Sequence, residues 1–209
     1  MIDLNYIKKS NQGKVVILLN RLKEHSIETY KHSLDVAETS VAIGKFVGLD
    51  MEQLQMLYTA GCLHDIGKLA VSSALLHKKG CTPEEVNYIR YTHIDFTYLL
   101  LKDQFDKSIV NICYHHHERL NGKGYPQGLK ANKLTENDKI VQVADVVSAL
   151  VLDRSYRTRK YNVPEAKQIL DRLVKKGDLD PFYVNIVKIA VLDKTYIPQD
   201  SKRHFNNNL

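Results

Sequence analysis

The sequence predicts an all-α protein, built as a helical bundle with extra helices at its carboxyl end. Apolar residues recur at helical spacing over almost the whole chain, and only 10 of the 209 residues are glycine and 5 are proline. A chain of this length can bury a substantial core in one domain. We therefore expect a helical domain over residues 24–197, preceded by a helical extension at 1–23 and followed by a flexible tail at 198–209.

The helices follow from apolar spacing and from residues that begin or end a helix. In chain order we expect helices over residues 15–22, 29–47, 54–63, 72–77, 83–101, 106–117, 136–152, 163–175 and 182–192. A break near Ser26 separates the first two, and Gly48 ends the second because glycine readily closes a helix. Thr82 followed by Pro83 is a strong signal for a helix start. The segment from Pro198, rich in asparagine and charge, is expected to be loose.

Charge, cysteine content and hydropathy narrow the class of protein. The formal net charge of +6 is spread along the chain without a basic arm, which suits a small anionic ligand and argues against a nucleic-acid polymer as partner. Cys62, Cys81 and Cys113 show no CxxC spacing, which indicates a reducing compartment. No apolar run reaches membrane-spanning length, and the start of the chain lacks a secretory signal. We expect a cytoplasmic protein that does not associate with a membrane.

One histidine interrupts a stripe of apolar residues in the segment 83–101. Val86, Ile89, His93, Phe96 and Leu100 share one helical face at the spacing of a buried stripe. A lone histidine in such a stripe is more often a hydrogen-bonded core residue than a metal ligand. Taken by itself, His93 therefore favours the structural interpretation.

The segment 106–117 ends in three consecutive histidines. Helical spacing turns His116 and His117 toward the apolar side and His115 toward the polar side. Consecutive inward histidines are hard to explain as packing, because each brings polar nitrogens that need partners. For His116 and His117 a role as metal ligands is the better interpretation.

Five more polar residues extend this set. Asp145 lies in an otherwise apolar helix, where it must bind a metal or pair with a cation such as an arginine; both interpretations stay open. Glu28 and His32 are four residues apart on one helical face, a spacing that is common by chance. His64 and Asp65 stand together at a helix end, where one imidazole and two carboxylate oxygens suit two divalent metals.

Together these residues predict a metal centre without thiolate ligands. Mixed imidazole and carboxylate ligands suit iron, manganese or zinc, and eight ligands are too many for one ion. Two ions bridged by Asp65 and a hydroxide would serve the hydrolysis of a phosphoester. The candidate ligands are Glu28, His32, His64, Asp65, His93, His116, His117 and Asp145.

The sequence resembles the HD-GYP family, a branch of the HD-domain metal-dependent phosphohydrolases. The matching segments, in the family's order over roughly residues 28–160, are HDIGKLAVSSALLHKKG, TPEEVNYIRYTH, HHERLNGKGYPQGL, KIVQVADVVSAL and DRSYR. The resemblance implies an HD-domain helical bundle that hydrolyses cyclic di-GMP to linear pGpG and in some members to GMP, by attack of a metal-bridging hydroxide. It implies two or three divalent ions, iron or manganese, with Glu28 as the carboxylate that accompanies a third metal.

The resemblance also implies roles for residues outside the ligand set. Asp65 and Lys68 would be catalytic, and Lys68, Tyr125, Arg154 and Arg157 would contact the cyclic dinucleotide substrate. The Gly-Tyr-Pro loop around Tyr125 would shape the pocket and bind a signalling protein partner. Without the resemblance, Lys68 is more simply a solvated lysine. The two arginines, three residues apart, suit phosphate oxygens, with an exposed basic patch as the alternative.

Several positions depart from the family's pattern. Phe96 replaces a glycine, Asn121 and Ser148 each replace an aspartate, and Ser72 replaces a proline. These changes leave the candidate ligands in place but affect pocket shape and nucleotide preference. Two alternatives therefore stay open: a catalytically weak module that binds cyclic dinucleotides or docks a partner, and a hydrolase that prefers cyclic GMP–AMP or another nucleotide.

Overall fold

The fold is that of a computed structural model, which describes residues 1–152 and 161–193. Within those ranges every regular element is a helix or a helical turn, so the predicted all-α class is confirmed. None of these described helices combines the length and the apolarity needed to cross a membrane. Arg154 and Arg157, and the predicted tail at 198–209, lie outside the described residues.

The helices agree closely with those expected from apolar spacing. The α-helices are α1 (Lys9–His25), α2 (Ile27–Phe46), α3 (Met51–Leu63), α4 (Ser73–Leu76), α5 (Pro83–Leu101), α6 (Lys107–His115), α7 (Glu136–Val151), α8 (Val163–Lys175) and α9 (Pro181–Val187). The shorter elements are η1 (Leu4–Tyr6), η2 (Ile66–Ala70), η3 (Ala131–Lys133) and the π-helical turn η4 (Lys188–Leu192). Only α1 starts well before its predicted position, because its first turns are polar and carry no apolar signal.

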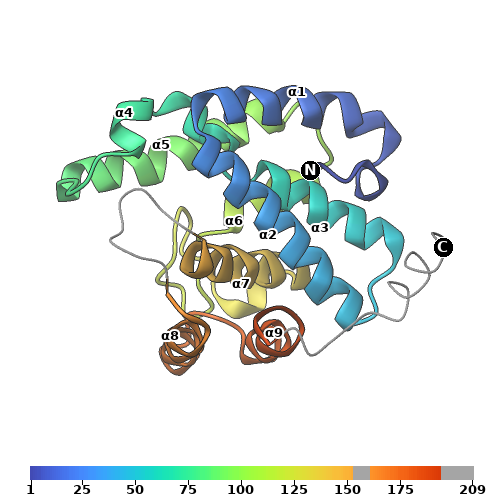
Figure 1. Ribbon diagram of the computed structural model, residues 1–209, viewed down its shortest axis with the longest axis vertical. Coiled ribbons are helices and arrows are strands. Elements are labelled where there is room, and N and C mark those ends of the chain that lie inside the picture. The colour runs from blue at the N-terminus through green and yellow to red at the C-terminus, as the bar shows by residue number, and fades with distance from the viewer. Residues whose placement is uncertain (153–160, 194–209) are drawn as a thin grey trace, which may run out of the picture.

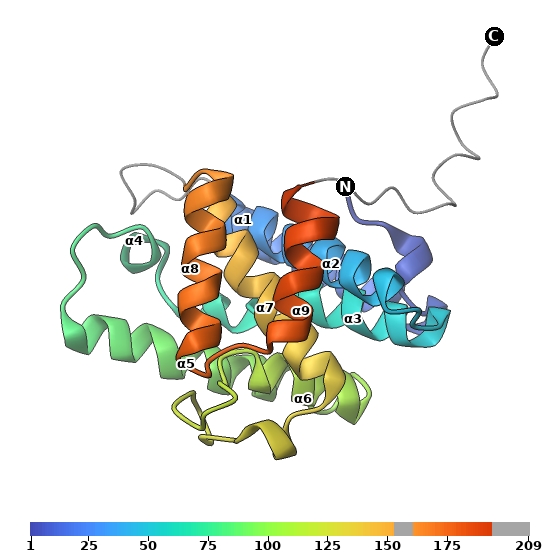
Figure 2. The ribbon, with the colours of Figure 1, turned by 90° about the horizontal axis from the view of Figure 1, so that it is seen from below.

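The helices pack around one hydrophobic core with α2 at its centre. α2 contacts α1, α3, α7 and α9. α8 and α9 lie on the side of α7 away from α1 (Figure 1) and run side by side (Figure 2), which confirms the predicted extra helices at the carboxyl end. α1 buries Val15, Leu19 and Leu22 in this core. The segment predicted as an extension, residues 1–23, therefore packs with the rest of the domain.

The predicted helix ends are held by local hydrogen bonds. Ser26 is extended (φ −154°) between α1 and α2, and its Oγ accepts a hydrogen bond from the backbone N–H of Thr29. Thr82 and Glu85 form a capping box at the start of α5. Gly48, with φ +80°, ends α2 in the left-handed conformation that glycine tolerates. The break and both end signals read from the sequence are confirmed.

The buried face of α5 differs from the predicted one. Val86 is 36% exposed and Phe96 is 44% exposed, so the predicted stripe is wrong in register. The buried residues of this helix are His93, Ile94, Thr97 and Leu101. The difference arises because η2 packs on α5. A small polar side chain is favoured next to the η2 backbone, and Thr97 occupies that place. The buried face of α5 is therefore rotated toward Thr97. Because Phe96 points to solvent, it does not crowd His93.

Gly67 permits the close contact between η2 and α5. Its backbone N–H donates a hydrogen bond to Thr97 Oγ1 at 2.9 Å. A Cβ atom at position 67 would lie 1.9 Å from the carbonyl oxygen of His93 and 2.5 Å from the N atom of Thr97. Both atoms belong to helix backbone, which cannot move aside as a flexible side chain would. Only glycine therefore fits at this position.

We expect Gly67→Ala to destabilise the metal-free protein by about 1–3 kcal/mol or more, because the added methyl group overpacks against α5. Urea denaturation followed by circular dichroism would measure the change. Gly13→Ala is the matched control: it lies in α1 with open space around its Cβ position, and alanine should stabilise that helix by about 0.5–1 kcal/mol. Equal stability of Gly67→Ala and the wild type would contradict the close contact.

Candidate metal centre

Five helical elements converge on one cluster of buried histidine and aspartate side chains. His32 comes from the middle of α2, His93 from α5 and Asp145 from α7. The remaining members lie at helix ends, where α3 passes into η2 and where α6 ends: His64, Asp65, His116 and His117. The structure thus brings together seven of the eight predicted ligands. The eighth, Glu28, lies one helical turn before His32 and lines the same cavity of about 190 Å³.

The two oxygens of Asp65 face two different sets of histidines. Oδ2 lies 3.4 Å from His64 Nε2 and 3.7 Å from His32 Nε2. Oδ1 lies 3.7 Å from His93 Nε2 and 3.9 Å from His116 Nε2. These separations are too long for hydrogen bonds, but atoms that bind one ion at about 2.1 Å lie roughly 3–4 Å apart. Asp65 therefore has the geometry of a bridge between two ions.

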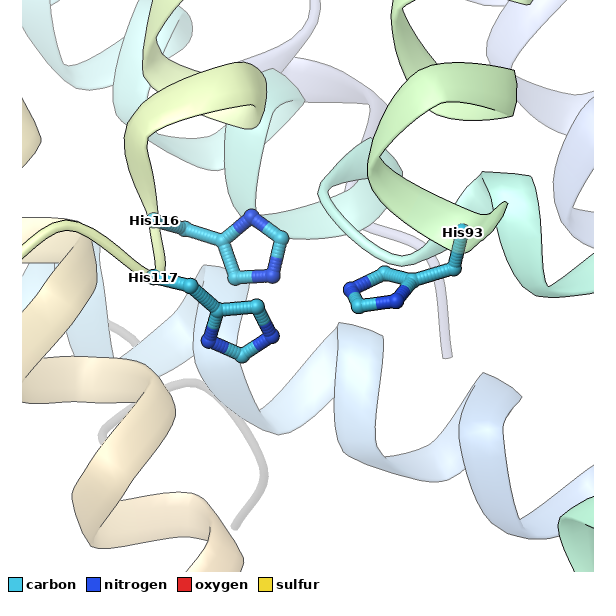
Figure 3. Close-up of side chains that lie close together, drawn as sticks. All are labelled: His93, His116 and His117. Carbon is cyan, nitrogen blue, oxygen red and sulfur yellow. The ribbon is translucent and has the colours of Figure 1, made fainter. Parts of the chain in front are cut away.

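The histidines fall into two groups on either side of this carboxylate. One ligand atom from each of His32, His64 and Asp65 lies within 4.8 Å of the others, and the same holds for His93, His116 and His117. Figure 3 shows His93 on α5 facing the rings of His116 and His117, with ring nitrogens directed into the space between them. The His116 and His117 rings are tilted by 43° to each other, with centroids 3.9 Å apart. Each group offers the three protein ligands that a divalent ion commonly takes.

Four buried atoms of the cluster have no hydrogen-bond partner among the described residues: His64 Nε2, Asp65 Oδ1, His93 Nε2 and His116 Nε2. A buried polar atom without a partner is costly, so such atoms are rare unless an ion or another ligand satisfies them. All four are atoms that would bind metal in the arrangement around Asp65. The residues present therefore fit divalent metal ions.

The opposite ring nitrogens of these histidines are occupied by backbone carbonyls. His64 Nδ1 donates to the carbonyl oxygen of Gly61 at 2.8 Å, and His116 Nδ1 donates to that of Cys113 at 2.6 Å. His93 Nδ1 makes the same kind of bond, at 2.7 Å, to the carbonyl four residues earlier. Since a carbonyl only accepts, Nδ1 carries the hydrogen and Nε2 carries the lone pair. Such bonds orient metal-binding histidines.

Electrostatics hold several members of the cluster in the protonation states that metal ligands need; His64 is the exception, because Asp65 outweighs burial and raises its pKa. Burial lowers the pKa of His93 to about 4, and burial with neighbouring His64 lowers that of His116 to about 3, so both rings are neutral at physiological pH. Burial favours the neutral acid of Asp65, but the Lys68 ammonium and the neighbouring histidines outweigh it and hold its pKa well below the usual range. Burial likewise favours the neutral acid of Asp145, but the hydrogen bond with His32 and the neighbouring histidines together outweigh it and lower the pKa of Asp145.

His32 is held at both ring nitrogens. Nε2 lies 3.0 Å from Asp145 Oδ1, and Nδ1 lies 2.8 Å from Ser148 Oγ. Ser148 stands where the resembling family has aspartate, and its hydroxyl can donate or accept. The serine thus still orients His32, although it brings no charge. Asp145 is paired with histidines of the cluster, as a metal ligand would be.

His115 lies outside the cluster, as predicted, but it does not point into solvent. Its Nδ1 is 3.3 Å from Asp138 Oδ1, and its side chain is mostly buried. α6 ends at His115, two residues earlier than expected. Because the chain leaves the helix there, His116 and His117 both face the cluster, although helical spacing alone would turn them 100° apart.

Two of the predicted substrate-contacting residues border the cluster. Lys68 lines the cavity, and its Nζ lies 2.6 Å from Asp65 Oδ2. The Tyr125 ring lies 4.8 Å from the His117 ring and 5.7 Å from the Tyr91 ring, measured between centroids. The guanidinium of Arg90 lies 5.6 Å from the Tyr125 ring centre. Tyr125 therefore lies between α5 and the histidines of the cluster.

Glu118 holds the Gly-Tyr-Pro loop and was missed in the sequence. Its carboxylate is fully buried and accepts hydrogen bonds from the backbone N–H groups of Gln127 at 2.7 Å and Leu129 at 2.9 Å. The sequence offers only a faint signal, an acidic residue directly between the histidines and a glycine-rich loop. Nothing local distinguishes it from a solvated glutamate.

Asn121 ties the same loop to the carboxyl-terminal helices. Its Nδ2 donates to Asp178 Oδ1 at 2.7 Å and to the carbonyl of Lys176 at 3.0 Å, both in the connection between α8 and α9. The aspartate found at this position in the resembling family would offer no donor and would face another carboxylate. The neighbour of Asn121 thus explains this departure.

The helical fold and the buried histidine–aspartate cluster define an all-α domain whose buried side chains could bind metal ions. A family model described as HD domain matches residues 16–182. The chain belongs to the HD-domain family, as the resemblance to its HD-GYP branch predicted.

Curated relatives include two phosphodiesterases that act on cyclic dinucleotides, by their names. The chain is 33% identical over 173 residues to the 3'3'-cGAMP-specific phosphodiesterase 1 of Vibrio cholerae, covering 82% of this chain and 40% of that protein. It is 35% identical over 169 residues to the cyclic di-GMP phosphodiesterase PA4108 of Pseudomonas aeruginosa, covering 79% of this chain and 40% of that protein. The chain thus spans about two fifths of the length of these relatives.

Solved structures share the fold. The HD domain of the Listeria monocytogenes phosphodiesterase PgpH, in complex with cyclic-di-AMP, matches with a TM-score of 0.62 at 20% identity, covering 86% of this chain and 96% of that one. Bd1817, an HDG"Y"P protein from Bdellovibrio bacteriovorus, matches with a TM-score of 0.62 at 20% identity, covering 77% of this chain and 51% of that one. At these identities the likeness shows a common fold.

We expect Glu118→Gln to loosen the Gly-Tyr-Pro loop, because an amide has one acceptor oxygen for two backbone donors and turns its own N–H₂ toward one of them. An unsatisfied buried donor costs about 1–3 kcal/mol. Hydrogen exchange should show faster exchange at Gln127 and Leu129 with unchanged protection in α2. Glu52→Gln, at an exposed pair with Lys8, is the control and should change neither. Unchanged exchange in Glu118→Gln would refute the role of this carboxylate.

Proposed function

We propose that this chain is a metal-dependent phosphodiesterase that hydrolyses cyclic di-GMP to linear pGpG and in part onward to GMP. The observation that carries the proposal is the set of partnerless buried ligand atoms on both sides of Asp65. The similarity to relatives named as cyclic di-GMP phosphodiesterases supports the substrate class. The net positive charge of the chain suits a dianionic ring.

The proposed cofactors are two divalent ions, or three with Glu28, and iron or manganese suit the imidazole and carboxylate ligands. Bound on either side of Asp65, such ions would activate a water molecule and stabilise the attacking and departing oxygens. Lys68, beside Asp65 in the cavity, would neutralise charge that develops on the reacting phosphate. Tyr125, next to His117, would form a wall for the nucleotide. Arg154 and Arg157 are proposed to grip its phosphates, since guanidinium groups suit phosphate oxygens.

Two further parts of the proposal concern the protein's surroundings. All three cysteines are free thiols, which supports a reducing, cytoplasmic location. The Gly-Tyr-Pro loop, held from within by Glu118, is proposed to bind a signalling protein partner. A loop that is fixed at its base and carries exposed residues, here Lys123 and Gln127, is suited to recognition.

Cyclic GMP–AMP is the second candidate substrate. The relative from Vibrio cholerae named for this nucleotide is about as similar to the chain as the relative named for cyclic di-GMP. The two nucleotides differ in one base and share the phosphodiester ring. The metal centre therefore serves both equally, and the choice depends on contacts to the bases.

The test is anaerobic purification with iron or manganese, metal counting, and chromatography of the products from cyclic di-GMP and cyclic GMP–AMP. We expect linear dinucleotide from the wild type with at least two metals per chain. Asp65→Ala and His116→Ala should lose activity by at least about 100-fold, because each removes a metal ligand. Asp103→Ala, at an exposed position, is the control and should keep wild-type activity.

Two results would contradict the proposal. Wild-type rates in Asp65→Ala and His116→Ala would exclude the metal centre as the site of the reaction. Tight binding of cyclic di-GMP and of metal, without product from either nucleotide, would instead favour a binding module.

A further inference from the structure

His77, which follows α4, lies on the wall of the metal-centre cavity and is absent from the predicted ligand set. The cavity is lined by His77 together with Glu28, Asp65, Lys68 and Asp145. α4 and the start of α5 project from the side of the bundle (Figures 1 and 2), so His77 reaches the cavity from an element that carries none of the other candidate ligands. Its side chain is 34% exposed, as expected at the mouth of a cavity.

The His77 ring is oriented in the same way as the metal-binding histidines of the cluster. Its Nδ1 lies 2.7 Å from the carbonyl oxygen of Ser73, four residues earlier. His64, His93 and His116 each make this bond to a carbonyl three or four residues earlier. Since the carbonyl accepts, His77 Nδ1 carries the hydrogen and its Nε2 presents a lone pair. Histidines oriented by such a bond are typical of metal sites.

The Nε2 atom of His77 faces the carboxylate of Glu28. The distance from His77 Nε2 to Glu28 Oε2 is 4.0 Å, which is too long for a hydrogen bond. It is close to the 3.4–3.9 Å that separate Asp65 from the four histidine nitrogens around it. His77 Nε2 also lies 3.4 Å from Ser26 Oγ, at the outer limit of a weak hydrogen bond. A divalent ion between imidazole and carboxylate would satisfy this geometry better than a direct contact.

We propose that His77 Nε2 and Glu28 together bind a third divalent metal ion at the mouth of the cavity. The inference rests on the proposed function for the presence of the other metals, and its new element is His77. One imidazole and one carboxylate, completed by water, suit the same ions as the central pair. The ion would fasten the segment after η2 to the start of α2. It would also leave open positions toward the cavity, where an anionic ligand would enter.

The first experiment counts metals in the full chain after anaerobic loading with manganese and desalting. We expect three ions per chain in the wild type and two in both His77→Gln and Glu28→Gln. Glutamine keeps hydrogen-bonding ability but is a poor ligand, so a hydrogen-bonding role for His77 would leave the count unchanged. His25→Gln is the matched control, because His25 bonds the carbonyl of Val71 and does not line the cavity. It should retain three ions.

A calorimetric titration with manganese gives a second measure. The weakest of the three sites in the wild type should disappear or weaken by at least about 10-fold in His77→Gln, while the other two keep their affinities. A wild-type count of two, or an unchanged count and affinity in His77→Gln, would overturn the inference. Neither measurement needs turnover, so a chain that binds three metals but hydrolyses nothing would refute the proposed function and not this site.

A third variant tests direct ligation and keeps the inference testable if His77→Gln folds poorly. His77→Cys loaded with cobalt(II) should show a thiolate-to-cobalt charge-transfer band beyond that of the wild type, because a thiolate bound to the ion gives this signature. His25→Cys should show no added band. Absence of the band in a folded, metal-loaded His77→Cys protein would count against His77 as a ligand.

Discussion

The structure depends on keeping the Asp65 carboxylate ionised although its side chain is almost fully buried. A buried carboxylate is costly unless opposite charges and ligands compensate for the lost hydration. Here an ammonium from Lys68 touches one oxygen, and imidazole nitrogens from several helices surround both. Because the histidines come from helices far apart in sequence, the helical bundle must fold correctly before they can surround the Asp65 carboxylate and compensate for its lost hydration. The fold and the site therefore depend on each other.

The site also shows how irregular backbone is placed where function requires it. Four of the candidate ligands, His64, Asp65, His116 and His117, lie where α3 and α6 end and the next segment turns. A regular helix would spread consecutive side chains around its axis. Ending the helix lets adjacent residues face one point, as His116 and His117 do. The helices hold the site rigid, and the helix ends allow neighbouring side chains to point toward the same place.

Much of the fold, and the candidate residues that the structure brings together, could be predicted from the sequence, because those signals are local or repeated. Helix caps such as Thr82 act within one helical turn. Inward-facing histidines can be recognised because they interrupt the spacing of apolar residues. The failures have a common cause. The register of α5 is set by its contact with Gly67. The role of Glu118 depends on backbone amides of the Gly-Tyr-Pro loop, and the position of His77 on the cavity wall becomes clear only when α2 is placed opposite it. Each depends on a partner distant in the chain or on a turn that spacing does not encode.

The hydrogen bond between Asn121 and Asp178 makes the residues at these two positions depend on each other. The two residues lie on different segments, and the amide at one position makes the acid at the other acceptable. Replacing Asn121 alone by the family's aspartate would therefore place two acids face to face. A departure from a family's pattern is therefore best interpreted together with the residues that it contacts. A single substitution to the residue found in a relative does not bring along the partner with which that residue interacts.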